Sequence, residues 1–457
     1  ERFAPRDMIP EELFDGEPSS LPHLFGSIEL HDVTVRDQDG NTILEDINLT
    51  IPPRSRVAIQ SDKPIERTAL AELLVRETLP AQGRVVLSGH PLEQLHQAVI
   101  AARIGYANSR PYLFDGTLGD NLLMPLKMRP RDTEHLVTAH DARAQETERA
   151  GNSTDPLLAD WVDPEIAGLA DGAEVRDWWF QLVEAMGIDE MMFRRTLRSR
   201  FVTEQHPGLA REIVALRPEI REKLRERGLD DAYFTLDPER FNPALPLAGN
   251  LLFATPVRDI LPEALAREKR FLQMLQDEGI ADDVISVSMG VIDTLNRTFG
   301  KDGTDHPLFL RLGLDKELYL RVSDIAARAA RRGKAALSQE DRAMLLIVPF
   351  MLTAEQIGPN FPDKYKRRIL MIRRNRGAEL RRNLADMFEP VDPDSYVPRL
   401  TVLENAIYGR VSIMAGAKAD EIENVVAEVL EAHGLRHRAA AILYDLRAGL
   451  GGTNLPT

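Results

Sequence analysis

Residues 56–76 read as a short apolar strand, a polar loop and a helix, which is the arrangement of a phosphate-binding loop. Such a loop, with the pattern G-x-x-x-x-G-K-[ST], uses glycines so that backbone N–H groups can surround phosphate oxygens, and a lysine that reaches the outer phosphates. In this sequence the glycine positions hold Ser61, Pro64 and Glu66, the lysine position holds Arg67 and the hydroxyl position holds Thr68. Pro64 has no N–H to donate, and Glu66 adds negative charge where phosphate would lie. The scaffold is therefore present with its usual phosphate-binding residues replaced.

Two interpretations of the start of this helix stay open. Arg67 can donate two hydrogen bonds to phosphate oxygens and Thr68 can approach Mg²⁺, which favours a residual phosphate contact. The alternative is an ordinary helix N-terminus with no ligand, which the neighbouring Pro64 and Glu66 favour.

The elements that position this loop follow from hydrophobic patterning. Three alternating runs are expected to form a hairpin, with its turn at Asp39-Gly40, that leads into a core strand; they are Ile28–Val35, Ile43–Ile51 and Val57–Ile59. Next, the pattern predicts a helix over Thr68–Arg76 and strands over Gly83–Leu87 and Arg103–Tyr106. Strand, loop, helix and strand together indicate an α/β layer.

Composition limits the class of protein. The chain has 457 residues, of which 43% are hydrophobic and 28% charged, as in a globular protein of two to four domains. A net charge of −15 argues against nucleic acid as a partner. The absence of Cys excludes disulfides and thiolate chemistry, and a reducing compartment is the natural expectation. Residues 1–26 read as a linker, and the charged amphipathic stretches of residues 129–235 and 256–388 predict helices.

One spacing recurs three times along the chain. An aromatic residue precedes an Asn by nine positions in Phe241–Asn250, in Tyr396–Asn405 and in Tyr112–Asn121. The pattern predicts one loop-to-helix element used repeatedly.

Residues 27–125 resemble the N-terminal half of an ATP-binding cassette domain of exporter-type transporters. The order of elements matches, and Ile104–Asn121 is similar to the family's Q-loop region. The resemblance resumes at Leu400–Gly409 and continues to Gly449–Leu455, which is similar to the approach to the signature motif. It implies a P-loop NTPase-like α/β cassette core, incomplete at its C-terminal side, with a large all-helical insertion. The implied domains are 1–26 (linker), 27–128 (N-terminal cassette part), 129–388 (insertion) and 389–457 (helical subdomain).

The resemblance also implies a function and a set of partners. It points to ATP with Mg²⁺ as ligands, bound weakly or not at all. It also implies a transmembrane domain as a partner, a second cassette as a further candidate partner, and a location at the cytoplasmic face of a membrane. The adenine-stacking aromatic is replaced near Asp37 and the Q-loop Gln by Ser109. The candidate nucleotide-binding residues are Ser61, Asp62, Lys63, Arg67, Thr68 and Ser109, with no catalytic residue and no protein metal ligand assigned.

Whether ATP is hydrolysed stays open, because the standard phosphate loop is altered and the Walker B half is not in the sequence. A rival interpretation is a nucleotide-free scaffold or adaptor whose helical insertion binds a protein partner. A third is an intact ATPase whose phosphate loop is built in another way.

Four other features have a functional and a structural interpretation. Tyr112-Leu113-Phe114 is either a surface for a transmembrane domain or core. His433 and His437 could share a helix face, but no third metal ligand accompanies them. The basic stretch Lys364–Arg382 is expected to be a solvated helix face rather than a lipid site, and Trp178-Trp179 is expected to pack in a core.

Overall fold

A computed structural model describes most of the chain. The described residues are 10–14, 18, 21–37, 39–108, 111–128, 130, 146–147, 149–152, 155, 159–257, 266–300, 303–310, 312, 314–358 and 361–449. Contacts divide the chain into two compact units, residues 1–178 with 447–457, and residues 179–446. This division differs from the domain boundaries at 128 and 388 that the sequence suggests, and those boundaries stay predictions.

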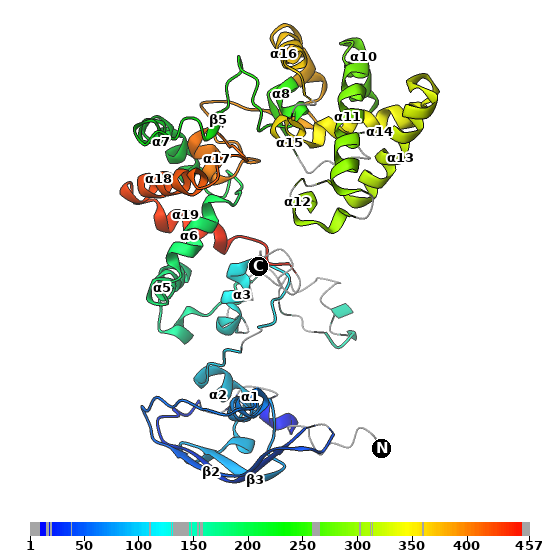
Figure 1. The fold of residues 1–457 in the computed structure, drawn as a ribbon. Coiled ribbons are helices and arrows are strands. Elements are labelled where there is room, and N and C mark those ends of the chain that lie inside the picture. The colour runs from blue at the N-terminus through cyan, green and yellow to red at the C-terminus, as the bar shows by residue number, and fades with distance from the viewer. Residues whose placement is uncertain are drawn as a thin grey trace. The chain divides into compact units, whose positions relative to one another are not determined.

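The first unit contains an antiparallel sheet with the strand order β2-β1-β3-β4, and α1 packs against it (Figure 1). Its main elements are β1 (Ile28–Arg36), β2 (Thr42–Ile51), α1 (Pro64–Leu74), β3 (Gln82–Leu87), β4 (His90–Pro91) and α2 (Gln97–Arg103). Apolar side chains of both strands and helices form the core, among them Leu30, Val33, Leu73, Val85 and Ile100. The predicted hairpin, the predicted helix at Thr68 and the predicted strand Gly83–Leu87 are therefore confirmed. The helix starts four residues before its predicted start.

Two predicted strands are wrong. Val57 and Ile59 lie in an irregular segment with 51% and 43% of their surface exposed, so no core strand leads into the loop. Arg103 ends α2, where the Ile104 N–H still donates to the Ile100 carbonyl, and Ile104–Tyr106 pairs with no strand of the described sheet. Short apolar runs predict a strand only when a neighbouring strand is available for pairing.

A bulge in β1 brings two backbones close together. Asp32 adopts φ of 53°, and opposite it Gly83 has φ of 81°. A Cβ on Gly83 would lie 2.4 Å from the Asp32 carbonyl oxygen, so this position needs glycine for both its conformation and its space.

The rest of the first unit consists of short helices and turns. These are α3 (Leu118–Leu122), α5 (Gly172–Ala185), which continues into the second unit, and the 3₁₀ turns Glu11–Leu13, Leu92–Gln94, Met124–Leu126 and Pro164–Ala167. Residue 447 forms a β-bridge with Thr117, and the Ala448 N–H donates to the Gly116 carbonyl at 2.8 Å.

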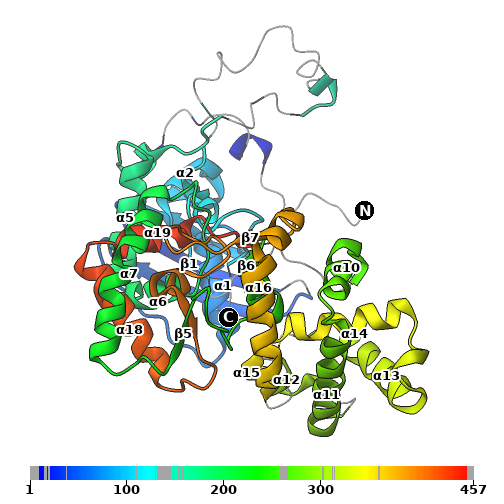
Figure 2. The ribbon, with the colours of Figure 1, turned by 90° about the horizontal axis from the view of Figure 1, so that it is seen from above.

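The second unit is mainly helical, as the amphipathic stretches predict. Its helices are α6 (Asp189–Leu197), α7 (Pro207–Glu226), α8 (Leu247–Leu252), α10 (Lys269–Asp277), α11 (Ala281–Phe299), α12 (Pro307–Leu310), α13 (Lys316–Arg332), α14 (Gln339–Met351), α15 (Ala354–Ile357), α16 (Asp363–Asn383), α17 (Val402–Ile407), α18 (Lys418–Ala432) and α19 (Arg436–Tyr444), with 3₁₀ turns at Gly303–Asp305 and Lys334–Ala336. Helices α6, α7, α17, α18 and α19 surround one core, and α8 with α10–α16 surround another (Figure 2).

Two short sheets join these helical groups. β5 (Tyr233–Thr235) pairs with β8 (Gly409–Val411), and β6 (Ala254–Pro256) pairs with β7 (Phe388–Pro390), both antiparallel. The order β5, loop, α8, β6 is repeated later in the chain as β7, loop, α17, β8, and we call these two segments the copies of the repeat. The first strand of each copy pairs with the last strand of the other. Between the copies lies a small core of matching residues: Leu236 and Val391, Leu245 and Leu400, Phe253 and Tyr408.

The repeated asparagine has the same role in both of these copies. The Asn250 side chain accepts from the Asn242 N–H at 2.8 Å and donates to the carbonyls of Asn242 and Leu245. The Asn405 side chain accepts from the Val397 N–H at 2.8 Å and donates to the carbonyls of Val397, Leu400 and Thr401. Both asparagines are fully buried. The repeated loop-to-helix element is thus confirmed, and we call this bonding the asparagine clasp.

An arginine from a distant helix holds each loop from outside. Arg217 of α7 donates to the Asn405 and Ser395 carbonyls at 2.8 and 3.0 Å and lies 4.5 Å from the centre of the Tyr408 ring. Arg373 of α16 donates to the Asn250 and Arg240 carbonyls at 3.1 and 2.8 Å and lies 5.4 Å from the Phe253 ring. α7 precedes the copy with Asn250 but its Arg217 bonds to the copy with Asn405, and α16 precedes the copy with Asn405 but its Arg373 bonds to the copy with Asn250. We call Arg217 and Arg373 the exchanged arginines.

Candidate functional site

The segment at the phosphate-loop position has a defined geometry around Ser61. The Ser61 hydroxyl donates to a carboxylate oxygen of Glu66 and accepts from the Lys63 N–H at 3.1 Å. Arg67 donates to the Ser61 carbonyl. The loop is therefore folded back onto its own helix, α1, by side chains that stand at the former glycine and lysine positions.

The Glu66 carboxylate lies beside Ser61 and Lys63, where the phosphate of a ligand would be expected. The Lys63 ammonium lies 3.2 Å from the Glu66 carboxylate, so one of the two nearby cations is already neutralised. The hydrogen bond from Ser61, followed by the one from Lys63, lowers the pKa of Glu66 below its ordinary value of 4.5. The carboxylate is thus held ionised at neutral pH, and a phosphate would have to displace it or tolerate its repulsion.

The sequence-predicted site residues are only partly brought together. Ser61, Lys63 and Arg67 converge with Glu66, whereas Asp62 and Thr68 are exposed on the same loop and helix start. Lys63 precedes Pro64 at the first turn of α1, where its side chain makes no capping hydrogen bond. Ser109 lies outside the described residues, so its predicted place beside the others stays a prediction.

The position of the expected adenine-stacking residue is a tight turn. Asp37 accepts from the Asn41 side chain at 2.9 Å and from the Asn41 and Asp39 N–H groups. These hydrogen bonds, the one from the Asn41 side chain first, lower the pKa of Asp37. A carboxylate engaged in its own turn offers no surface on which a base could stack.

The segment around α3 has the hydrogen bonds that its sequence pattern predicts, unlike the phosphate-loop position. Thr117 and Asp120 form a reciprocal capping box at the helix start. Asn121 makes the asparagine clasp here too, accepting from the Phe114 N–H at 2.8 Å and donating to the Phe114 and Thr117 carbonyls at 3.1 and 2.9 Å. The clasped residue is Phe114, so this loop is one residue shorter than the other two.

This first copy of the element exposes its aromatic residues. Tyr112 and Phe114 have 64% and 47% of their surface exposed, and their rings meet edge to face with centroids 5.0 Å apart. In the other copies the aromatic nine residues before the asparagine is covered: Tyr396 is buried and contacts the Phe201 ring at a tilted angle, and Phe241 is half-buried against Phe361. Of the two interpretations of Tyr112-Leu113-Phe114, the exposed surface agrees with the structure.

The approach to the signature-like segment lies beside this element. Residues 447 and 448 pair with Thr117 and Gly116, and Ala448 is fully buried. Of the predicted segment Gly449–Leu455, only its first residue lies among the described residues.

The two histidines that could have formed a metal site point to separate carboxylates. His433 pairs with Glu219 and His437 with Glu184, each at 2.8 Å. The described part of the chain contains no group of three potential metal-ligating side chains. Across the same residues, no helix combines the length and apolarity that crossing a bilayer requires.

The basic and tryptophan-rich stretches are both helical. Helix α16 spans Lys364–Arg382, and several of its arginines pair with carboxylates, such as Arg376 with Glu278 at 2.6 Å. Trp179 is buried beside Tyr444, but Trp178 has 43% of its surface exposed, so the expected core packing holds for one of the two tryptophans.

Sequence reasoning did not identify the two exchanged arginines. Arg217 and Arg373 make contacts with residues far away in sequence, which local patterns do not encode. A signal was nevertheless present, because each arginine lies at nearly the same distance before the next repeated asparagine in the sequence.

Comparison with known proteins points to one kind of protein. The chain is 38% identical over 88 residues to the transport/processing ATP-binding protein ComA of Streptococcus pneumoniae, covering 19% of this chain and 12% of that protein. It is 31% identical over 145 residues to a fatty acid ABC transporter ATP-binding/permease protein of Mycobacterium bovis, covering 32% and 22%. It is 32% identical over 122 residues to an ATP-dependent lipid A-core flippase of Alkalilimnicola ehrlichii, covering 26% and 21%.

These similarities cover only part of each protein, and the chain spans less than a quarter of the length of these relatives. No protein-family model matches the chain. β1, β2, α1, β3 and the α3 element follow the order expected from the exporter resemblance, although the two strands expected at Val57–Ile59 and Arg103–Tyr106 do not form, and the mixed α/β content is compatible with a cassette that carries a helical insertion. These similarities support a transporter-associated ATP-binding cassette segment of the exporter type within this chain.

Proposed function

We propose that this chain is the cassette part of a membrane transporter in which nucleotide binding is weakened and which transmits movement to a transmembrane domain. The similarity to ATP-binding/permease proteins supports the transporter assignment. The observation that carries the coupling role is the hydrogen-bonded α3 element with its exposed Tyr112 and Phe114. A second cassette could pair with this one, and the complex would lie at the cytoplasmic face of a membrane.

The altered phosphate loop supports weak nucleotide binding. Lys63 and Arg67 are engaged within the loop, and the Glu66 carboxylate faces the same space. Each charge-assisted hydrogen bond to phosphate that is lost removes about 1.5 to 3 kcal/mol. Losing two of them is enough to move a micromolar affinity into the millimolar range. The loop as built does not fit a tightly bound Mg²⁺-nucleotide, and we assign no hydrolytic step to it.

The nucleotide part of the proposal is tested by calorimetry with ATP and ADP in the presence of Mg²⁺. We expect binding weaker than about 100 μM, with a further loss in Arg67→Ala and a gain in Glu66→Gly, because the second change removes the competing charge. Submicromolar binding by the unaltered chain would contradict a weakened site. Unchanged affinity in both variants would show that the loop is not where nucleotide binds.

The coupling part is tested by photo-crosslinking in native membranes. A benzoylphenylalanine at position 112 should crosslink to a polypeptide that mass spectrometry identifies as membrane-spanning. The matched control is the same probe at position 414, because Met414 is also apolar and has 83% of its surface exposed. Equal crosslinking from both positions, or none from position 112, would remove the α3 surface from consideration.

A further inference from the structure

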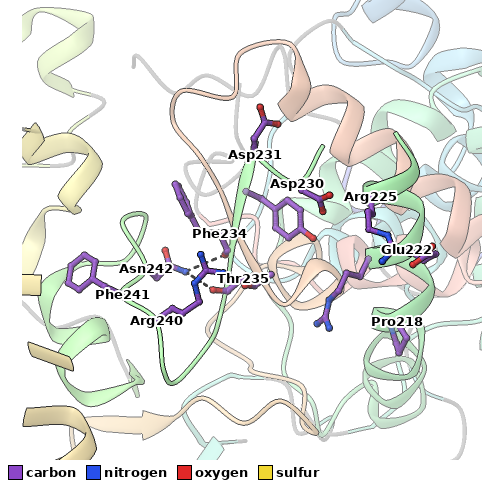
Figure 3. Close-up of a pocket in the computed structure, with 12 residues that line it drawn as sticks. Pro218, Glu222, Arg225, Asp230, Asp231, Phe234, Thr235, Arg240, Phe241 and Asn242 are labelled. Carbon is purple, nitrogen blue, oxygen red and sulfur yellow. Dashed lines mark hydrogen bonds and ion pairs between the residues drawn. The ribbon is translucent and has the colours of Figure 1, made fainter. Parts of the chain in front are cut away.

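A cavity of about 520 Å³ opens between α7, β5 and the loop that follows β5 (Figure 3). Its volume falls in the range of small-molecule sites. The residues that line it are Pro218, Arg221, Glu222, Arg225, Asp230, Asp231, Tyr233, Phe234, Thr235, Arg240, Phe241 and Asn242. Three arginines and three aromatic residues thus border one space in a chain whose net charge is −15.

Several of the charges around the cavity neutralise one another. Arg225 pairs with Glu222 at 2.5 Å, and Asp231 pairs with Lys418 at 2.7 Å. Arg221 and Arg240 form no side-chain hydrogen bond or ion pair with any residue that the structure describes. The lining as a whole carries three arginines and three carboxylates, and of these only Arg221, Arg240 and Asp230 stand outside the two pairs.

The wall that carries Arg240 is held rigidly. The Arg240 carbonyl accepts from Arg373 at 2.8 Å, and the Arg240 N–H donates to the Asp237 carbonyl. The Asn242 side chain donates to the Phe234 and Thr235 carbonyls, the two bonds drawn in Figure 3. The backbone position of Arg240 is thus fixed, which limits where its exposed side chain can reach.

The second copy of the repeat shows that the fold does not need these arginines. Counted from the clasping asparagine, Arg240 corresponds to Ser395. Counted from the exchanged arginine, Arg221 corresponds to Gly377. The two copies share the asparagine clasp and the exchanged arginine. They do not share Arg221 and Arg240, so these two arginines belong to the cavity rather than to the repeated architecture.

We propose that this cavity binds a phosphate-bearing small molecule with an aromatic ring. Arg221 and Arg240 would hold the phosphate groups, for which the guanidinium fork is well suited. The half-buried rings of Phe234 and Phe241 border the same space and offer an apolar surface to the ring of the ligand. The site is separate from the phosphate-loop position at residues 61–68.

The test is calorimetry of the whole chain with three probes: ADP, inorganic pyrophosphate and adenosine. ADP should bind more tightly than either fragment. The double variant Arg221→Gln/Arg240→Gln should weaken ADP binding by about 100-fold or more, because a charge-assisted hydrogen bond to each guanidinium typically accounts for tenfold or more. Arg211→Gln, an exposed position on α7 that does not line the cavity, is the matched control and should leave the affinity unchanged.

Two further arms make the result specific to this cavity. ADP binding is expected in two components, a weak one at the phosphate-loop position and one at this cavity. Arg67→Ala should reduce only the first and leave the component that the double variant removes. If Arg67→Ala removes all ADP binding and the double variant removes none, the ligand belongs to the phosphate-loop position and the proposal is overturned. Hydrogen exchange of the unaltered chain with ADP should slow in residues 218–242, independently of how the variants fold. Pyrophosphate or adenosine binding as tightly as ADP, or no binding of any probe at millimolar concentration, would also overturn it.

Discussion

The asparagine clasp allows a graded prediction, because its three copies differ in burial. Asn405 is fully buried, whereas Asn121, in the first copy along the chain, is half-exposed. Replacing Asn405 by Ala leaves the Val397 N–H without its acceptor and the Leu400 carbonyl without a donor, whereas the Val397 carbonyl keeps the Leu400 N–H as its donor. The Thr401 carbonyl keeps the Asn405 N–H as its donor.

The magnitude follows from these orphaned groups. A buried N–H without a partner costs about 1 to 3 kcal/mol, and the orphaned Leu400 carbonyl adds up to about 1 kcal/mol. Together with a small cavity, we expect Asn405→Ala to lower the free energy of unfolding of its part of the chain by about 2 to 4 kcal/mol. Water can replace the lost bonds at the half-exposed copy, so Asn121→Ala should cost about 1 kcal/mol.

The assay must separate local from global effects, because a chain of two units need not unfold in one step. Urea unfolding followed by circular dichroism gives the stability change, and hydrogen exchange of the peptide that contains Val397 reports on the clasp directly. In Asn405→Ala the Val397 amide should exchange faster, with little change around Phe114. Equal destabilisation by Asn405→Ala and Asn121→Ala, or an unchanged Val397 exchange rate, would refute the reasoning from burial.

Three further predictions concern other parts of the structure. Gly83→Ala should destabilise the first unit by about 2 kcal/mol or more in urea unfolding, because the added Cβ meets a carbonyl and φ is positive. Arg373→Met should lower stability measurably, since the Asn250 carbonyl loses its donor, while Arg373→Lys should recover only part of the loss because it cannot form both bonds. Glu66 has a lowered pKa, so its contribution is complete above the ordinary value of 4.5 and is lost as the pH falls through the folded pKa; NMR titration should show the Ser61 signals shifting only below pH 4.5.

Local patterns predicted those parts of the fold whose contacts are local. The β1–β2 hairpin, α1 and β3 follow from alternation, a turn signal and helical periodicity, and they form where expected. Val57–Ile59 failed because the same apolar pattern needs a pairing partner, and the structure leaves these residues exposed. A strand depends on a neighbour that may lie anywhere along the chain, which a window of a few residues does not contain.

The candidate site was predictable to a similar extent. The spacing of the repeated asparagines indicated a common element, and hydrogen bonds confirm it. The engagement of Lys63 and Arg67 by Glu66 and Ser61 depends on side-chain geometry at one helix start, which the motif alone could not give. The cavity arginines come from a helix and a loop that meet only in the folded chain.

The pairing of β6 with β7 has a topological consequence for the helices between them. The Val257 N–H donates to the Met387 carbonyl at 2.9 Å, so the chain leaves the repeat and returns to it at adjacent points. Closing such an excursion costs an entropy that grows only with the logarithm of its length. Helices α10–α16 can thus lengthen, shorten or diverge with little penalty on closure itself, provided that α16 still reaches the first copy. Arg373, Arg374 and Arg381 of α16 contact that copy, and these side chains therefore limit how freely the excursion can change.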